Sequence, residues 1–163
     1  MINRRRVLAA AGGIAALTAA GAVAAPATAV PGRIGSVQAS HRRTGTMKIG
    51  IRIDDTVLTA TLEDSATARD FASLLPLTVT LRDYASTGKI ADLPRRLSEE
   101  DAPAGSDPSV GDIAYYAPWG NLAIFHHDFG YSRGLIHLGT VESGIEALSR
   151  PGPRTATIEL LDR

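Results

Sequence analysis

The chain has 163 residues, no cysteine and equal numbers of basic and acidic side chains. This length suits a single domain that buries a core without disulfides or structural metals. The charge is uneven along the chain, because residues 46–163 hold 11 Lys and Arg against 17 Asp and Glu, a net charge of −6. An acidic domain repels phosphate backbones, and no basic patch is interleaved with aromatic residues, so these features argue against nucleic-acid binding.

Residues 1–29 have the pattern of a twin-arginine export signal. Arg4-Arg5 is followed by a spacer and two apolar residues, and residues 7–23 are uncharged and weakly hydrophobic. Ala27-Thr28-Ala29 is an A-x-A site, which predicts cleavage of the signal. The alternative is an uncleaved anchor, since the apolar stretch is at the lower length limit for a membrane span. We expect the twin-arginine translocase to export the chain to the extracellular space, the cell envelope or the periplasm, with membrane contact only during export.

Residues 30–45 are rich in Gly, Ser, Arg and Thr and show no apolar period. This composition predicts a flexible linker. The remaining residues, 46–163, are expected to form one folded domain.

The domain begins with two runs that alternate apolar and polar residues. Residues 47–53 and 56–62 have this period of two, which is typical of half-buried strands. Asp54-Asp55 between them is a tight-turn pair, so the two runs predict a hairpin. Residues 77–81 are rich in Thr, Val and Leu and predict a third strand.

Residues 63–75 change to a helical period and end at Pro76, which cannot continue a helix. Ala68, Phe71 and Leu75 then share one face. The candidate N-terminal caps are Asp64, Ser65 and Thr67, the last of which resembles a capping box with Asp70.

The second half of the domain alternates strands with loops. Residues 83–109 are polar and rich in Pro, Gly and Ser, which predicts a long loop with a short edge segment at 90–94. Further strands are predicted at 113–117, 122–126, 134–141 and 154–161, and a short helix at 142–148. Seven or eight short strands with one or two helices indicate a closed barrel or a sandwich.

Gly111-Asp112-Ile113-Ala114-Tyr115-Tyr116-Ala117-Pro118-Trp119-Gly120-Asn121-Leu122-Ala123-Ile124-Phe125 resembles the bacterial cyclophilin-like domain family. Residues 67–76 are similar to the first helix of that family. Residues 92–94 and 142–148 resemble its middle loop and its late helix. The resemblance covers nearly all of 47–161 and implies a mainly β fold, a closed cyclophilin-like β-barrel of about eight strands with one or two flanking helices.

The resemblance does not carry an activity with it, because a shared fold does not transfer function. Prolyl isomerases of this fold place an arginine within a Phe-x-x-Phe-His-Arg strand motif, where it polarises the proline amide. This chain has only the partial match Phe125-His126-His127, which lacks that arginine.

Six of the eight aromatic residues lie within residues 115–131. Alternation places Tyr115 and Tyr116 on opposite faces, so one of them belongs to the core. The other, with Trp119 at a turn, can line a pocket at one end of the barrel; the alternative is that all of these rings pack the interior and cap its ends. The expected pocket combines residues 116–121, residues 126–131 and the long loop 83–109.

The residues expected to bind a ligand are Arg82, Tyr84, Tyr116, Trp119, Asn121, Phe125 and His127. Arg82 can anchor a carboxylate group, although an ion pair on the surface explains an arginine there equally well. Residues 118–121 fit a binding loop and also fit a simple hairpin turn.

His126-His127-Asp128 suggests a metal site. Neighbouring strand residues point to opposite faces, so only His126 and Asp128 share a side, and two ligands do not make a zinc site unless His137 adds a third. We therefore expect no metal and no cofactor.

The sequence favours a non-enzymatic exported barrel that binds a small molecule or an extended peptide. The alternative is a peptidyl-prolyl isomerase with a non-standard site. No residue is assigned a catalytic role.

Overall fold

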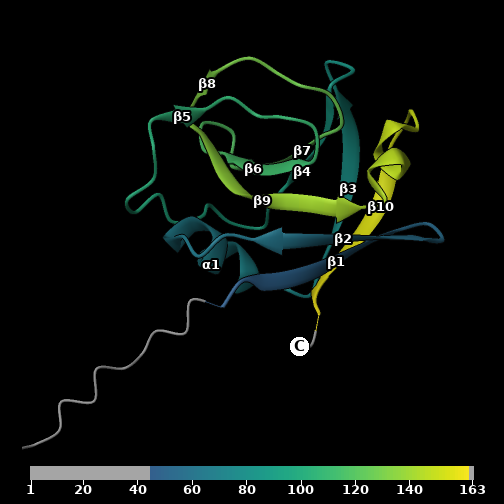
Figure 1. Cartoon of the computed structure of the whole chain (residues 1–163), viewed down its shortest axis with the longest axis horizontal. Helices are drawn as coiled ribbons and strands as arrows, with labels where there is room; N and C mark the ends of the chain where they lie inside the picture. Colours follow the sequence, from purple (N-terminus) through teal and green to yellow (C-terminus); the bar gives the residue numbers. More distant parts are fainter. Residues whose placement is uncertain (1–44, 162–163) are drawn as a thin grey trace, which may run out of the picture. The chain divides into compact units, whose positions relative to one another are not determined.

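The structure is a computed structural model that describes residues 45–161, so the expected export signal and nearly all of the expected linker lie outside the described residues. Eight strands close into an antiparallel barrel in the order β1-β10-β3-β4-β7-β6-β9-β2 (Figure 1). A separate two-stranded ribbon pairs β5 with β8. The prediction of a closed barrel of about eight strands is thereby confirmed.

The barrel strands are β1 (Met47–Ile53), β2 (Thr56–Leu62), β3 (Leu77–Tyr84), β4 (Gly88–Asp92), β6 (Asp112–Tyr116), β7 (Asn121–Phe125), β9 (Leu135–Ser143) and β10 (Arg154–Leu160). The ribbon strands are β5 (Gly105–Ser106) and β8 (Ser132–Arg133), and the helices are α1 (Ala66–Ala72) and the 3₁₀ helix η1 (Ile145–Ser149). None of the helices among residues 45–161 is both long and apolar enough to cross a membrane.

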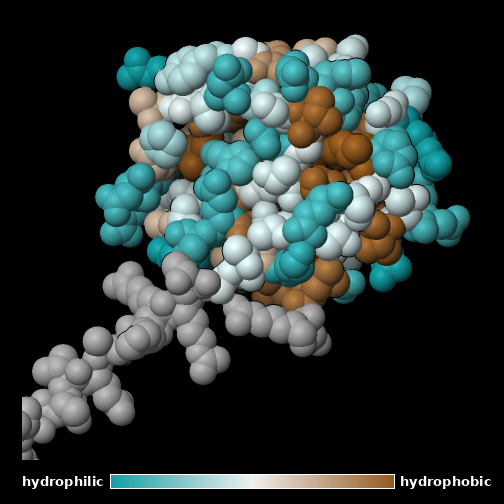
Figure 2. Space-filling view, viewed as in Figure 1, coloured by the Kyte–Doolittle hydropathy of each residue, from teal (hydrophilic) through white to brown (hydrophobic). Residues whose placement is uncertain are grey.

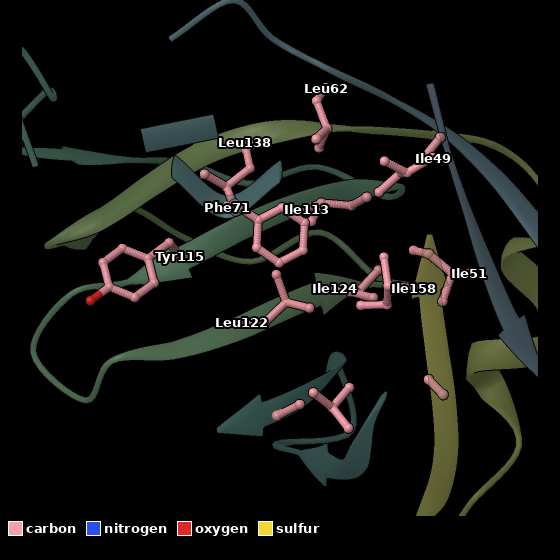
Figure 3. Packing of buried hydrophobic residues seen from close by; sticks show 14 of the residues in the cluster. Ile49, Ile51, Leu62, Phe71, Ile113, Tyr115, Leu122, Ile124, Leu138 and Ile158 are labelled. Atoms are coloured by element: carbon pink, nitrogen blue, oxygen red, sulfur yellow. The ribbon is translucent and has the colours of Figure 1, made fainter. Parts of the chain in front are cut away.

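Alternating strand residues fill the barrel with aliphatic side chains. Ile49, Ile51 and Ile158 come from the paired strands β1 and β10, and all three are buried. Phe71 of α1 enters the same core, where Figure 3 shows its ring among side chains of the barrel strands. Gly139 in β9 lets that strand approach β2, because a Cβ there would lie 2.2 Å from the backbone oxygen of Thr61. The core is continuous, so the barrel has a filled interior.

The first hairpin forms as its alternation predicts, but the helix is shorter than expected. Helix α1 begins after Ser65, whose hydroxyl accepts a hydrogen bond from the backbone N–H of Ala68 at 3.1 Å. Ser65 is therefore the cap among the three candidates. Thr67 is buried within the helix and does not form the expected capping box.

The largest difference from the sequence-based expectation concerns the predicted loop at 83–109. Strand β3 continues to Tyr84, and β4 returns beside it, so the segment expected at an edge lies inside the barrel wall. Ala85 and Ser86 make the intervening turn with φ of 47° and 57°. Such left-handed conformations are usually taken by Gly or Asn, and the sequence therefore shows no turn signal here.

The late helix also differs from its predicted bounds. Strand β9 extends through Ser143, and the helix that follows is a 3₁₀ helix from Ile145. Gly144, with φ of 84°, separates the two. The buried residues Ala147 and Leu148 of η1 join the barrel core.

The surface in the view of Figure 2 is mostly hydrophilic, with hydrophobic residues in small separate groups. The largest exposed apolar and aromatic side chains are Val57, Val110, Trp119, Tyr131 and Leu160. Trp119 is 61% exposed and Tyr131 is 65% exposed. Both belong to the aromatic-rich stretch of the sequence, and exposed aromatic side chains of this kind are often used in binding.

Candidate ligand-binding site

Strands β6 and β7 separate two apolar clusters, one on each face. Tyr115 and Leu122 point into the barrel core, whereas Ala114, Ala123 and Phe125 belong to a second cluster outside it. Tyr116 packs against that second cluster. The alternation therefore divides the two tyrosines as expected, but the second set lies on the outer wall of the barrel and not at its end. Strand pairing alone does not show which part of the chain covers that wall.

The outer cluster encloses a cavity of about 110 Å³, here called the aromatic cavity. Five of its lining residues are aromatic and come from different segments of the chain. The lining residues are Tyr84, Ile90, Tyr116, Trp119, Asn121, Ala123, Phe125, Phe129, Ser132 and Leu135. All three segments expected to form a pocket contribute to it.

The rings of the aromatic cavity meet at steep angles. The Trp119 ring is nearly perpendicular to that of Tyr116, at 86° and 5.2 Å between centroids, and to that of Tyr84, at 82° and 6.3 Å. Phe129 lies 6.1 Å from Tyr84 and stacks on Phe125 at 5.9 Å. These are favourable edge-to-face and offset arrangements. Trp119 is thus nearly perpendicular to its two neighbours, whereas Phe125 and Phe129 form a stacked pair.

Asn121 is the unusual member of the cavity lining. Its side chain is 2% exposed, and its Oδ1 atom has no hydrogen-bond partner among the described residues. A buried acceptor left unpaired costs about 1–3 kcal/mol of stability. Buried polar groups in folded proteins are nearly always paired, and this unpaired oxygen belongs to a residue that lines the aromatic cavity.

A tight turn and an arginine hold Trp119 at the cavity. The backbone N–H groups of Trp119 and Gly120 donate to the Tyr116 carbonyl at 3.2 and 2.8 Å, and Gly120 has a φ of 71°. Arg96 Nη1 donates to the Ala117 carbonyl at 2.6 Å. Residues 117–120 therefore form the hairpin turn between β6 and β7, close to the turn at 118–121 that one interpretation of the sequence predicted, and this turn carries the cavity residue Trp119.

Hydrogen bonds also fix the loop that bears Phe129. The backbone N–H of Phe129 donates to the Pro108 carbonyl at 3.1 Å. Asp128 accepts a hydrogen bond from the backbone N–H of Val110 at 3.0 Å. These bonds join the loop after β7 to the segment before β6 and keep the Phe129 ring over the barrel wall.

Two of the seven expected binding residues do not line the aromatic cavity. Arg82 donates to Asp92 at 2.8 Å and borders a different hollow on the β3–β4 surface. His127 is exposed, and its ring lies 4.9 Å from that of His126. The other five expected residues come together. The cavity residues that were not among the seven are Ile90, Ala123, Phe129, Ser132 and Leu135, of which Ile90 and Phe129 lie in segments that were expected to contribute. The pairing of Ile90 with Ala123 would reveal two of them, but it requires strand β4 inside the barrel wall, where only a short edge segment at 90–94 was expected.

A second buried polar group lies at the other end of the β4–β7 ladder. Lys89 is 1% exposed, forms an ion pair with Asp83, and donates to the carbonyls of Arg150 and Gly152 at 2.7 and 3.0 Å. The Lys89 ammonium and the Gly152 N–H lower the pKa of Asp83. All three N–H groups of the buried Lys89 ammonium thus have an acceptor, and this cluster closes the core where η1 ends.

His126 borders this lysine cluster. Burial, and then the charges of His127 and Lys89, lower the pKa of His126. Its Nδ1 atom is buried without a partner among the described residues. Within residues 45–161, no three His, Cys, Asp or Glu side chains converge as metal ligands.

The comparisons with known proteins concern the fold. No curated protein matches the chain. The solution structure of the hypothetical protein AF2241 from Archaeoglobus fulgidus is similar, with a TM-score of 0.58 and 15% sequence identity, over 73% of this chain and 98% of that one. The model of the cyclophilin-like family matches residues 51–159, which is most of the barrel. The chain therefore belongs to the cyclophilin-like family.

Proposed function

We propose that this domain is a non-enzymatic binding protein whose aromatic cavity takes a small organic molecule or one side chain of an extended peptide. The observation that carries this proposal is the cavity that five aromatic rings line on the outer wall of the barrel. An apolar cavity of about 150 Å³ is large enough for benzene. A cavity of about 110 Å³ suits one small ring or one branched group.

The chemistry of the lining supports binding over catalysis. None of the ten lining residues is Asp, Glu, His, Lys, Arg or Cys. The hydroxyls in the lining belong to Tyr84, Tyr116 and Ser132. A hydroxyl needs an adjacent base or charged group to act in nucleophilic or acid–base catalysis, and no such group lines the cavity. Prolyl isomerisation with a polarising arginine has no support here either, since Arg82 is paired with Asp92 outside the cavity.

We further propose that the chain is exported by the twin-arginine route. This proposal is supported by Arg4-Arg5, the weakly apolar stretch 7–23 and the A-x-A site at 27–29. Replacing both arginines, Arg4→Lys with Arg5→Lys, is expected to keep the precursor in the cytoplasm of an expressing bacterium. Fractionation and immunoblotting measure this. Export of the doubly substituted chain at the normal rate would contradict the proposal.

The only tryptophan of the chain, Trp119, lies at the cavity and reports on binding directly. We expect N-acetyl-proline methylamide or cyclopentanol to change the Trp119 emission in a saturable way. Ala123→Leu, which fills the cavity from strand β7, is expected to abolish that change. Tyr131→Ala is the control, because Tyr131 is aromatic and exposed but does not line the cavity.

Two results would count against the proposal. Saturable binding that Ala123→Leu leaves unchanged would place the site elsewhere. Prolyl isomerisation in a protease-coupled assay, lost in Ala123→Leu and kept in Tyr131→Ala, would show that the cavity is catalytic and would favour the isomerase alternative.

A further inference from the structure

A second and larger hollow, of about 740 Å³, lies beside the aromatic cavity. Tyr116 lines both spaces, and the turn at 117–120 and the segment 132–136 each contribute residues to both. The two spaces are therefore neighbours on the outer wall of the barrel. The larger one is here called the arginine hollow, because Arg96 and Arg133 belong to its lining.

These two arginines are exceptions to the way in which the domain pairs its charges. Residues 45–161 contain ten Lys and Arg against 16 Asp and Glu. Seven of the ten cations form ion pairs with carboxylates. The three described cations that do not are Arg96, Arg133 and Arg150, and the first two line the arginine hollow. Although acids are in excess, two cations without a carboxylate thus lie in one place.

Both arginines keep hydrogen-bond donors that a ligand can use. Arg133, in β8, is exposed and makes no ion pair or side-chain hydrogen bond with any of residues 45–161. Arg96 donates to the Ala117 carbonyl at 2.6 Å and to the Pro118 carbonyl at 3.4 Å. A guanidinium has five N–H donors, so Arg96 is fixed by two of them and still offers others. A group that is fixed before binding loses less entropy when a ligand arrives.

The charge of the arginine hollow matches a single carboxylate. Glu99 also lines the hollow, so its charged side chains sum to +1. A guanidinium binds a carboxylate through two parallel hydrogen bonds. A phosphate group carries about two negative charges, which exceeds this local charge in a domain with a net charge of −6. The hollow therefore favours a carboxylate over a phosphate.

An extended peptide can place an apolar group and a carboxylate in the two neighbouring spaces at once. Side chains two residues apart lie on the same face of an extended chain, about 6.5–7 Å from each other. One side chain then enters the aromatic cavity, and the other reaches the arginine hollow on the far side of Tyr116. A C-terminal carboxylate close to the apolar residue has similar reach.

We propose that the domain binds an acidic peptide, in which Arg133 and Arg96 hold a carboxylate within about two residues of the apolar side chain that occupies the aromatic cavity. This inference rests on the proposed binding function and names its ligand class. The carboxylate belongs either to a Glu or Asp side chain or to the C-terminus of the peptide, since both present the same group to a guanidinium.

Matched peptides measure the contribution of the carboxylate. Acetyl-Pro-Ala-Glu-amide is compared with acetyl-Pro-Ala-Gln-amide, which has the same shape without the charge, and the same pair is tested in the reverse order. Acetyl-Pro-Ala with a free carboxyl group, compared with its amide, tests the C-terminal source. By calorimetry and Trp119 emission, we expect the charged member of at least one pair to bind about fivefold more tightly. This preference should shrink in about 1 M NaCl, where the Debye length is about 3 Å.

Three variants assign the preference to residues. Arg133→Met is expected to reduce the preference to about twofold or less, and it breaks no hydrogen bond of the described residues. Arg150→Met is the matched control, because Arg150 is also exposed and without a carboxylate among residues 45–161 but lines neither space. Glu99→Gln removes the acid of the hollow, so it is expected to increase the preference about twofold. Binding of N-acetyl-proline methylamide should be unchanged in Arg133→Met.

Each contrary outcome has a defined meaning. Equal affinity within all three peptide pairs would overturn the inference, as would a preference that Arg133→Met and Arg150→Met reduce equally or that Arg133→Met leaves intact. Binding of N-acetyl-proline methylamide with no preference for a carboxylate would leave the proposed function in place. A preference in only one pair supports the inference and identifies the source of the carboxylate. Absence of binding by the peptides, N-acetyl-proline methylamide and cyclopentanol alike would overturn both proposals.

Discussion

Strands β4 and β7 each carry one buried polar residue, and the two differ in how they are satisfied. Lys89, in β4, is 1% exposed and contacts a carboxylate and two backbone carbonyls. Asn121, in β7, is 2% exposed, and its carbonyl oxygen contacts no donor among the described residues. The two lie at opposite ends of the same ladder, because β4 pairs Lys89 with Ile124 and Asp92 with Asn121.

The difference separates a structural role from the proposed binding role. A buried ion that is fully paired is costly to disturb, since removal leaves its partners unpaired. A buried amide that lacks a partner already lowers stability, and its removal relieves that cost. Lys89 therefore stabilises the fold, whereas Asn121 lowers stability, and a stability cost of this kind supports the proposed binding role because it is typical of functional sites.

Lys89→Met gives the largest expected effect. The substitution keeps the apolar length of the side chain but leaves the Arg150 and Gly152 carbonyls without their donor. We expect the free energy of unfolding to fall by about 2–4 kcal/mol, measured by urea unfolding at pH 7.

Lys48→Met is the matched control for that variant. Lys48 also forms an ion pair, with Glu142 at 2.7 Å, but its side chain is 51% exposed. Exposed pairs contribute little, so stability is expected to stay nearly unchanged. If Lys89→Met and Lys48→Met proved equally mild, the assignment of Lys89 as the group that closes the core would be wrong.

Asn121→Leu is expected to act in the opposite direction. It exchanges an unpaired buried amide for an apolar group of similar size, so the free energy of unfolding should rise by about 1 kcal/mol. Thermal unfolding measures this as a higher Tm. Asn121→Asp is the comparison variant. It buries a charge without a partner at the same position and should lower the Tm. Destabilisation by Asn121→Leu would show that the amide is satisfied and would remove the contrast with Lys89.

The sequence predicted the fold where turn chemistry and periodicity agree. Strands β1 and β2 have the predicted bounds because Asp54-Asp55 marks the turn between two alternating runs. The hairpin between β3 and β4 was missed because Ala85 and Ser86 take left-handed φ values without being Gly or Asn. In this case the closed barrel imposes a turn that local propensity does not favour, and tertiary packing overrides the local signal.

The candidate site was predictable in composition but not in position. Alternation along β6 and β7 separated Tyr115 from Tyr116 and drew attention to Trp119 and Phe125. Which face the later loop covers depends on long-range contacts, such as the bond from Phe129 N–H to the Pro108 carbonyl. These contacts have no sequence period, so the sequence reasoning placed the pocket at the barrel end.

Arg96→Met tests how the cavity wall is held. The Arg96 guanidinium donates to the Ala117 and Pro118 carbonyls, beside Trp119. Without these bonds the turn is less fixed, and ligand binding must order it, so the affinity for N-acetyl-proline methylamide should fall about threefold. Arg52→Met is the control, because Arg52 is exposed on β1 and pairs with Glu159. An equal loss of affinity in both variants would indicate a general effect of removing a positive charge, and would contradict a specific role of Arg96 in holding the turn.

His126→Gln gives the smallest expected effect and tests the lysine end of the ladder by pH. Burial and the nearby His127 and Lys89 lower the pKa of His126 in the folded protein, so the folded state binds fewer protons than the unfolded chain. The stability that neutral His126 contributes is present above the unfolded pKa of about 6.5 and is lost as the pH falls through the lower, folded pKa. Urea unfolding at pH 7.5 and pH 5 should therefore show a smaller loss of stability in His126→Gln than in the natural chain. His127→Gln, which removes only one of the neighbouring charges, should give an intermediate loss, whereas identical pH dependence in all three proteins would mean that the pKa of His126 does not differ between the folded and the unfolded chain.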